Sequence, residues 1–131
     1  MPVQSRIRDV MHRAIVTCEV NTPAKEAAQL LSRYESHALV VFDEMGEVTG
    51  IITVSDLVKN YFRDLTGLRA EDIMSTPVIT VAGSATIAEA AQIMLDHGAH
   101  QLVVLHTAEG SRRRAVGLIT RAHVLKEMLT P

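Results

Sequence analysis

The feature that most constrains the fold of this chain is an internal duplication. Segments of the first half recur in the second half at an offset of 63 residues, which later grows to 67. The recurring pairs are Asp9-Val10-Met11 and Asp72-Ile73-Met74, Glu26-Ala27-Ala28-Gln29 and Glu89-Ala90-Ala91-Gln92, Leu39-Val40-Val41 and Leu102-Val103-Val104, and Gly50-Ile51-Ile52-Thr53 and Gly117-Leu118-Ile119-Thr120. Because self-similarity at a nearly fixed period indicates a repeated structural unit, the chain is predicted to contain two copies of one fold.

Each copy is predicted to run strand, helix, strand, strand, helix. The first strands are the β-prone segments Ile15–Thr17 and Val78–Val81. The next helices have apolar residues at the i, i+3, i+4, i+7 spacing of one buried face. These residues are Ala24, Ala27, Ala28 and Leu31 in the first copy, and Ile87, Ala90, Ala91 and Met94 in the second.

The second strand of each copy is continuously apolar, as expected for a strand covered on both faces. These strands are Leu39–Phe42 and Leu102–Leu105. The following hairpin turn is short in the first copy and runs from Thr107 to Arg114 in the second. The last helices are expected to carry Leu57, Val58, Tyr61 and Phe62, and Val124, Leu125, Met128 and Leu129.

The predicted fold class is therefore α/β (α+β-like), with a first repeat over residues 7–64 and a second over residues 70–129. A unit of about 55 to 60 residues is only marginally stable by itself. We therefore expect the two repeats to pack sheet to sheet about a pseudo-twofold axis, leaving two symmetry-related clefts.

Composition narrows the possible partners. The net charge of −2 disfavours nucleic acid, since phosphate binding shows as clustered positive charge. No apolar run approaches the roughly 20 residues that span a bilayer, so we expect no membrane partner. Cys18 is the only cysteine, which excludes an intramolecular disulfide and favours a reducing compartment. We expect a soluble, cytoplasmic protein.

The end of each repeat carries the strongest functional signal. Gly50–Asp56 and Gly117–His123 each lead from an apolar strand through a Thr into a helix. Uncapped amides at such a junction favour an anion or a nucleotide. The alternative is structural, because Thr, Ser and Asp are also the residues that cap helix starts.

Together, the tandem strand-helix-strand-strand-helix unit, the Asp-Val/Ile-Met openers, the Leu-Val-Val strands and the Gly-apolar-apolar-Thr-x-x-Asp ending resemble the CBS domain (cystathionine β-synthase-type) family. The resemblance covers about residues 7–129 and matches a CBS pair, or Bateman module. It implies a regulatory module that binds AMP, ADP or ATP, or else S-adenosylmethionine or NAD. It also implies a homodimer that acts on a regulated partner protein, which the sequence does not identify.

In that family the Thr or Ser at the junction contacts phosphate, and the Asp three residues later contacts the ribose hydroxyls. The resemblance further implies that the junction of one repeat faces the first strand and the start of the second strand of the other. The intact cleft is then expected to contain Thr53, Asp56, Pro77, Val78, Ile79, His100 and Gln101. The altered cleft is expected to contain Ala14, Ile15, Val16, His37, Ala38, Thr120, Arg121 and His123.

The altered cleft departs from the family pattern because His123 stands where Asp is expected. A neutral imidazole offers one donor and one acceptor, so it does not replace a carboxylate that accepts from two hydroxyls. Arg121 adds a cation there, which favours a more highly charged ligand or no ligand. This departure supports an alternative function, a dimerisation and protein-interaction module that works without a ligand.

Other sites are less well supported. The spacing of His97 and His100 is a weak metal signal, and no carboxylate or Cys completes a ligand set, so no metal is expected. The run Arg112–Arg114 is read as a solvated hairpin tip. The sequence has no nucleophile elbow, Walker loop, dinucleotide-binding fingerprint or acid/base carboxylate pair. No catalytic residue is therefore assigned, and the chain is not expected to be an enzyme.

Overall fold

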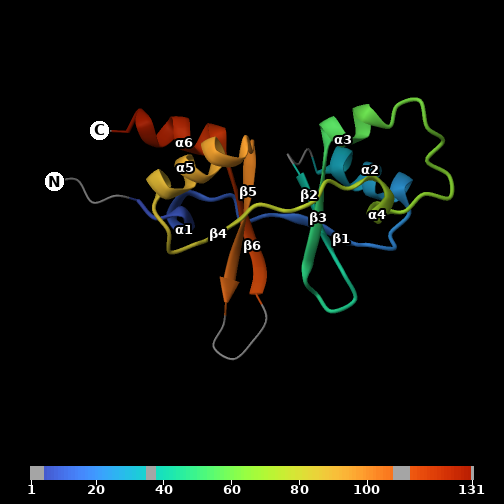
Figure 1. Ribbon diagram of the computed structural model, residues 1–131, viewed down its shortest axis with the longest axis horizontal. Coiled ribbons are helices and arrows are strands. Elements are labelled where there is room, and N and C mark those ends of the chain that lie inside the picture. The colour runs from blue at the N-terminus through green and yellow to red at the C-terminus, as the bar shows by residue number, and fades with distance from the viewer. Residues whose placement is uncertain (1–4, 35–37, 108–112, 131) are drawn as a thin grey trace. The chain divides into compact units, whose positions relative to one another are not determined.

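The computed structural model describes residues 5–34, 38–107 and 113–130 (Figure 1). They form two compact units. One unit is the contiguous stretch Ile15–Val78, which we call the central unit. The other combines the described residues up to Ala14 with those from Ile79 onward, and is called the terminal unit. The predicted α/β class and the duplicated order of elements are confirmed.

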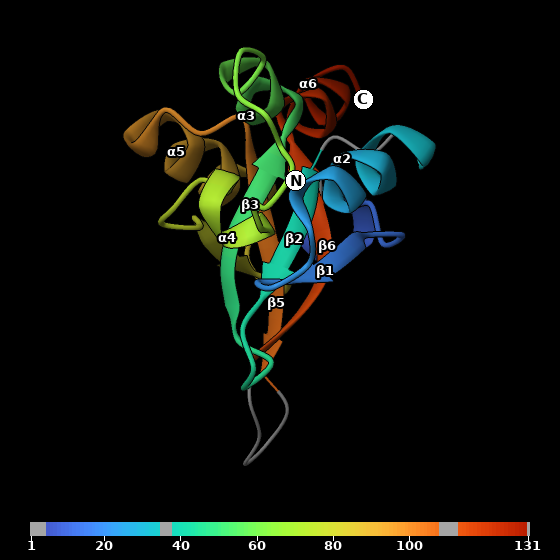
Figure 2. The ribbon, with the colours of Figure 1, turned by 90° about the vertical axis from the view of Figure 1, so that its right-hand side faces the viewer.

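The central unit is built on one three-stranded sheet among its described residues. Its strands are β1 (Val16–Glu19), β2 (Ala38–Phe42) and β3 (Val48–Thr53), and its helices are α2 (Ala24–Arg33), α3 (Val54–Lys59) and α4 (Ala70–Ile73). The strand order is β1-β2-β3, with β1 parallel and β3 antiparallel to β2. Figure 2 faces this unit and shows α2 and α4 on the viewer's side of the sheet.

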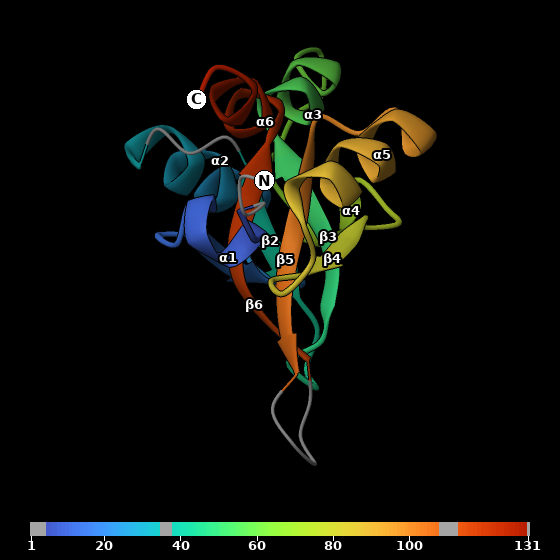
Figure 3. The same ribbon diagram turned by 90° about the vertical axis from the view of Figure 1, so that its left-hand side faces the viewer.

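The terminal unit repeats this arrangement in its described part. Its strands are β4 (Thr80–Ala82), β5 (Gln101–Thr107) and β6 (Arg113–Thr120), and its helices are α1 (Ile7–Val10), α5 (Ile87–His97) and α6 (Arg121–Met128). The order is β4-β5-β6, again parallel and then antiparallel. Figure 3 shows this unit with α1 and α5 on the viewer's side of its strands.

Each unit has its own apolar core, formed by the helix faces that the sequence predicts. In the central unit, Ala24, Ala27 and Leu31 of α2 pack with strand residues such as Leu39 and Ile52. In the terminal unit, the corresponding core residues are Ile87, Ala90, Met94, Leu102 and Ile119. The middle strands are buried across both faces, since Ala38 to Val41 and Leu102 to Val104 are all buried. This confirms the reading of their continuous apolar sequence.

The two Asp-Val/Ile-Met segments form short helices that no sequence pattern predicted, and the two helices are exchanged between the repeats. Helix α1 begins the first repeat of the sequence but packs in the unit that holds the sheet of the second. Ile7 N donates to Ala85 O (2.9 Å), and Arg8 N donates to Gly83 O (2.9 Å). Helix α4 begins the second repeat of the sequence but packs in the unit that holds the sheet of the first, where Ala70 N donates to Thr22 O (2.7 Å).

Some element boundaries differ from the prediction. Helix α3 ends at Lys59, because Asn60 caps it and its side-chain amide donates to Asp56 O (2.7 Å). Tyr61 and Phe62 therefore lie beyond the helix, with 78% and 97% of their surfaces exposed. Strand β1 begins at Val16, one residue later than expected.

The second hairpin turn is also shorter than predicted. Thr107 pairs with Arg113 and His106 with Arg114, so the antiparallel ladder extends to both arginines. The prediction that the arginine run forms the hairpin tip is therefore wrong for Arg113 and Arg114, which are strand residues, although Arg114 is exposed as expected; Arg112 lies outside the described residues. No helix within the described ranges is long and apolar enough to cross a membrane.

Candidate functional site

The junction of β3 and α3 holds the two residues with the strongest sequence signal, Thr53 and Asp56. Thr53 is the N-cap of α3, and its hydroxyl accepts a hydrogen bond from Asp56 N (3.3 Å). In return, Thr53 N donates to Asp56 Oδ2 (2.8 Å). This reciprocal arrangement is a capping box. The structural reading of the motif is therefore correct in its geometry, and any ligand must share these groups with the cap.

Asp56 is buried, with 5% of its surface exposed. Its Oδ2 also accepts from the Thr53 hydroxyl (3.0 Å), and its Oδ1 accepts from Ser75 Oγ (2.5 Å). Burial of a carboxylate is tolerated when such donors surround it. The carboxylate therefore lies at the meeting point of three segments, β3, α3 and the residues after α4.

Ser75 was not among the candidate residues. Its backbone pairs with β3, since Ile51 N donates to Ser75 O (3.2 Å) and Ser75 N donates to Ile51 O (2.7 Å). This pairing brings its hydroxyl to Asp56 from 19 residues away in the sequence. The only sequence signal was its place directly after the duplicated Asp-Ile-Met segment.

The other residues assigned to the intact cleft are divided between the units. Pro77 is exposed, and Val78 is half-buried at the end of the central unit. Ile79 begins the terminal unit, where its carbonyl accepts from Val103 N (3.1 Å). His100 is exposed and Gln101 is half-buried opposite Thr120. Direct contact is thus shown for Thr53 with Asp56, and the assembly of the full cleft stays a prediction.

The junction of β6 and α6 has the same capping geometry with an imidazole in place of the carboxylate. Thr120 N donates to His123 Nδ1 (2.9 Å), and His123 N donates to Thr120 Oγ1 (3.4 Å). An accepting Nδ1 places the proton of a neutral imidazole on Nε2. Arg121 is exposed, and its Nε donates to Ala99 O (3.2 Å). Part of the guanidinium that was expected to favour a more highly charged ligand is therefore engaged by the protein.

The remaining residues of the altered cleft also lie in both units. Ala14 is exposed in the terminal unit, while Ile15 and Val16 are half-buried in the central unit. Ala38 is buried at the start of β2, directly opposite Thr53. His37 lies outside the described residues. The assignment of these residues to a ligand is likewise still a prediction.

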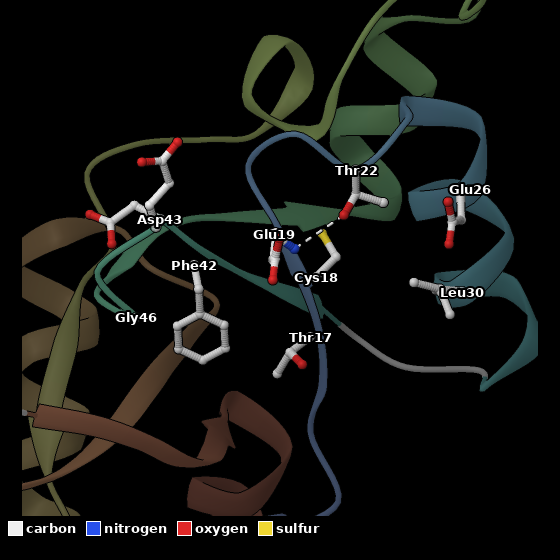
Figure 4. Close-up of a pocket in the computed structure, with 10 residues that line it drawn as sticks. Thr17, Cys18, Glu19, Thr22, Glu26, Leu30, Phe42, Asp43 and Gly46 are labelled. Atoms are coloured by element: carbon white, nitrogen blue, oxygen red, sulfur yellow. Dashed lines mark hydrogen bonds between the residues drawn. The ribbon is translucent and has the colours of Figure 1, made fainter.

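A surface cavity of about 620 Å³ lies elsewhere in the central unit, beside the β2–β3 turn (Figure 4). Its rim is acidic, with carboxylates from Glu19, Glu26, Asp43 and Glu44. The Cys18 thiol lies at its base, where burial raises the pKa of that thiol. The carboxylate of Asp43 is used by the turn itself, since it accepts from Met45 N and Glu47 N.

Histidines do not form a metal centre in the part of the chain that the structure covers. Gly98 adopts a left-handed conformation (φ 61°) and ends helix α5 between His97 and His100. His100 therefore lies beyond the end of α5, and the two imidazoles do not lie one turn apart on a single helix. Within the described ranges, no group of three or more His, Cys, Asp or Glu side chains is arranged to hold a metal ion.

Comparison with known proteins identifies a duplicated domain of one family in this chain. A family model described as "CBS domain" matches residues 7–63 and 70–130. The homoserine O-acetyltransferase of Methanosphaera stadtmanae is 28% identical over 121 residues, which cover 92% of this chain and 24% of that protein. The inosine-5'-monophosphate dehydrogenase of Bifidobacterium longum is 31% identical over 118 residues, covering 88% and 21%. The chain thus spans about a quarter or less of these two relatives.

Solved structures agree with this match. The CBS domain pair of protein MJ0100, in complex with 5'-methylthioadenosine and S-adenosyl-L-methionine, has a TM-score of 0.82 and 25% identity, covering 96% of this chain and 97% of that one. CBSX2 in complex with AMP has a TM-score of 0.76 and 23% identity, covering 95% and 96%. The likeness to CBSX2 concerns the fold alone.

Proposed function

The chain belongs to the CBS domain family, and from this premise we propose that it is a regulatory module that binds an adenosyl ligand and reports the presence of that ligand to a partner protein. The role is regulatory and not catalytic. AMP, ADP and ATP are the first candidates, with S-adenosylmethionine and NAD as alternatives. The complex of the MJ0100 pair with two adenosyl compounds supports this ligand class.

The observation that carries the proposal is the buried carboxylate of Asp56 beside the Thr53 hydroxyl. A carboxylate offers two oxygens and so can accept from both hydroxyls of a ribose. Burial strengthens such hydrogen bonds, because water competes less for the carboxylate. We assign ribose recognition to Asp56 and phosphate recognition to Thr53. We assign adenine recognition to Pro77, Val78, Ile79, His100 and Gln101.

The second junction is proposed to bind such a ligand weakly or not at all. His123 Nδ1 is already used by Thr120 N, and a neutral imidazole has no second acceptor for a pair of hydroxyls. One ligand per chain is therefore the expected stoichiometry.

Isothermal titration with AMP, ADP, ATP, S-adenosylmethionine and NAD tests this proposal. Asp56→Asn should weaken binding at least tenfold, because the amide keeps one oxygen for the cap but loses the charge and the second acceptor. Asp64→Ala is the matched control, since Asp64 is an exposed acid of the same unit. Binding by none of the five compounds, or equal binding by Asp56→Asn and the wild type, would refute the assignment.

A second candidate function, assembly without a ligand, is favoured by exposed apolar side chains near α3 and α6. Val58, Phe62, Met128 and Leu129 each expose two thirds or more of their surface. Apolar side chains that form a large contiguous exposed patch mark interaction surfaces. We therefore propose a homodimer. Light scattering should show a dimer for the wild type and a monomer for Phe62→Glu, and a monomeric wild type at high concentration would exclude it.

A further inference from the structure

The hydrogen bonds around Asp56 leave little room for a ligand. A carboxylate has about four lone-pair positions. Two of them, on Oδ2, are taken by Thr53 N (2.8 Å) and the Thr53 hydroxyl (3.0 Å), and a third, on Oδ1, is taken by Ser75 Oγ (2.5 Å). A ribose offers two hydroxyls, so at least one internal donor has to leave before Asp56 can accept from both.

Among the three donors, the Ser75 hydroxyl is the easiest to displace. Thr53 N is a backbone group fixed by the N-cap, and the Thr53 hydroxyl also accepts from Asp56 N. Ser75 Oγ needs only a rotation about one side-chain bond, and Ser75 is half-buried, so its hydroxyl has access to other partners. On the basis of the proposed function, we propose that Ser75 is an internal competitor of the ribose, and that ligand binding displaces its hydroxyl from Asp56.

This displacement connects the ligand to the last segment of the central unit. In the structure, the Ser75–Asp56 bond joins the start of α3 to the residues that follow α4. The backbone of Ser75 stays paired with Ile51 on β3, so only its side chain has to move. Loss of the bond removes this link between Ser75 and α3 and leaves the backbone pairing of Ser75 with β3 intact.

The second junction provides an internal comparison. His12 has the backbone position of Ser75, since it exchanges two hydrogen bonds of 2.9 Å with Leu118 just as Ser75 does with Ile51. His123 has the capping position of Asp56. Both members of the Ser–Asp pair are thus replaced together in the unit that lacks the carboxylate, as expected if the two residues act together.

The test is titration of wild type and Ser75→Ala with AMP, 5'-methylthioadenosine and 2',3'-dideoxy-AMP. Removing a competing hydrogen bond should tighten binding of AMP or 5'-methylthioadenosine by about three- to tenfold. The dideoxy compound has no hydroxyl that could displace Ser75, so its affinity should not change. Ser75→Thr, which keeps the hydroxyl, should behave as wild type, and Ser32→Ala controls for a serine exposed on α2 of the same unit.

The outcomes separate this proposal from the proposed function. If wild type binds AMP or 5'-methylthioadenosine but Ser75→Ala binds equally or more weakly, the competitor role is overturned and the proposed function stands. The competitor role is also overturned if Ser75→Ala tightens the dideoxy compound, because the effect would then not depend on the ribose hydroxyls. If neither protein binds AMP or 5'-methylthioadenosine, this proposal is overturned together with adenosyl binding.

Discussion

Gly50 lies in β3 against the side chain of Met74, and alanine at this position should be destabilising. An added Cβ would overlap Met74 Sδ and lie 2.7 Å from its Cγ. Gly117 has the same position in β6, where an added Cβ would lie 2.7 Å from Met11 Sδ and 2.8 Å from the His12 carbonyl oxygen. The two glycines differ in what has to move. At Gly50 only the flexible side chain of Met74 has to move. At Gly117 the backbone carbonyl of His12 has to move as well.

The expected magnitudes follow from this difference. Overpacking of a core costs about 1–3 kcal/mol, and replacing a glycine by alanine returns about 0.4–1 kcal/mol through the unfolded chain. From the middle of these ranges, Gly50→Ala should therefore lose about 1.3 kcal/mol of unfolding free energy. In Gly50→Ala combined with Met74→Ala the overlapping atoms are gone. The double variant should thus be more stable than the sum of the single effects by about 1–2 kcal/mol.

Gly117→Ala should not be rescued in this way. The His12 carbonyl also accepts from Leu118 N (2.9 Å), so the ladder holds it in place. Met11→Ala removes the sulfur but leaves the backbone overlap. The coupling free energy of Gly117→Ala with Met11→Ala should then be below about 0.5 kcal/mol.

Urea unfolding followed by far-ultraviolet circular dichroism measures both cycles, since the chain has no Trp. With a slope of about 1–3 kcal/mol per molar urea, a loss of about 1.3 kcal/mol moves the midpoint by about 0.4–1.3 M. Equal coupling in the two cycles would refute the reasoning, and so would a Gly50→Ala variant as stable as wild type.

Three further perturbations test other parts of the structure. At pH 8 the Cys18 thiol should react with iodoacetamide more slowly than glutathione does, because burial raises its pKa and the thiolate is the reactive form. The Asp64 carboxyl should titrate below its ordinary pKa of 3.8 because Thr66 N donates to it, and its contribution to stability should be lost as the pH falls below that value. Carbon-13 NMR should show that Thr66→Ala raises this pKa only part of the way, since the backbone donor remains. His123→Asp should stabilise the protein by about 0.5–1 kcal/mol at pH 7, because a carboxylate then caps the positive end of α6, and an unchanged or lower thermal midpoint would contradict this.

The regular elements could be predicted because each occurs twice in the sequence and has the apolar pattern of a helix or a buried strand. The buried face of Ala24, Ala27 and Leu31 follows from helical spacing, and the buried middle strand at Leu102–Val104 follows from a continuous apolar run. The prediction was wrong at the end of helix α3, where the helical spacing of apolar residues continues but the helix does not. Tyr61 and Phe62 continue an apolar helical pattern, yet the cap at Asn60 ends α3 before them.

The candidate site was only partly predictable, for a physical reason. The capping contact between Thr53 and Asp56 spans three residues and is encoded locally. The Ser75 contact depends on a backbone pairing with Ile51, and no periodicity in the sequence predicts that pairing. The same is true of α1 and α4, since four residues are too few to show a period or to indicate which sheet they will join.

The exchanged positions of α1 and α4 also set an order of folding during synthesis. The central unit is contiguous, so all of its elements are available once Val78 has emerged from the ribosome. Helix α1 is made before the central unit, but its partners Gly83, Ala85 and, through Met11 and His12, β6 are made after it. Domains fold as their chain is completed. The central unit can therefore fold before the terminal unit is complete, and α1 has to wait for β6.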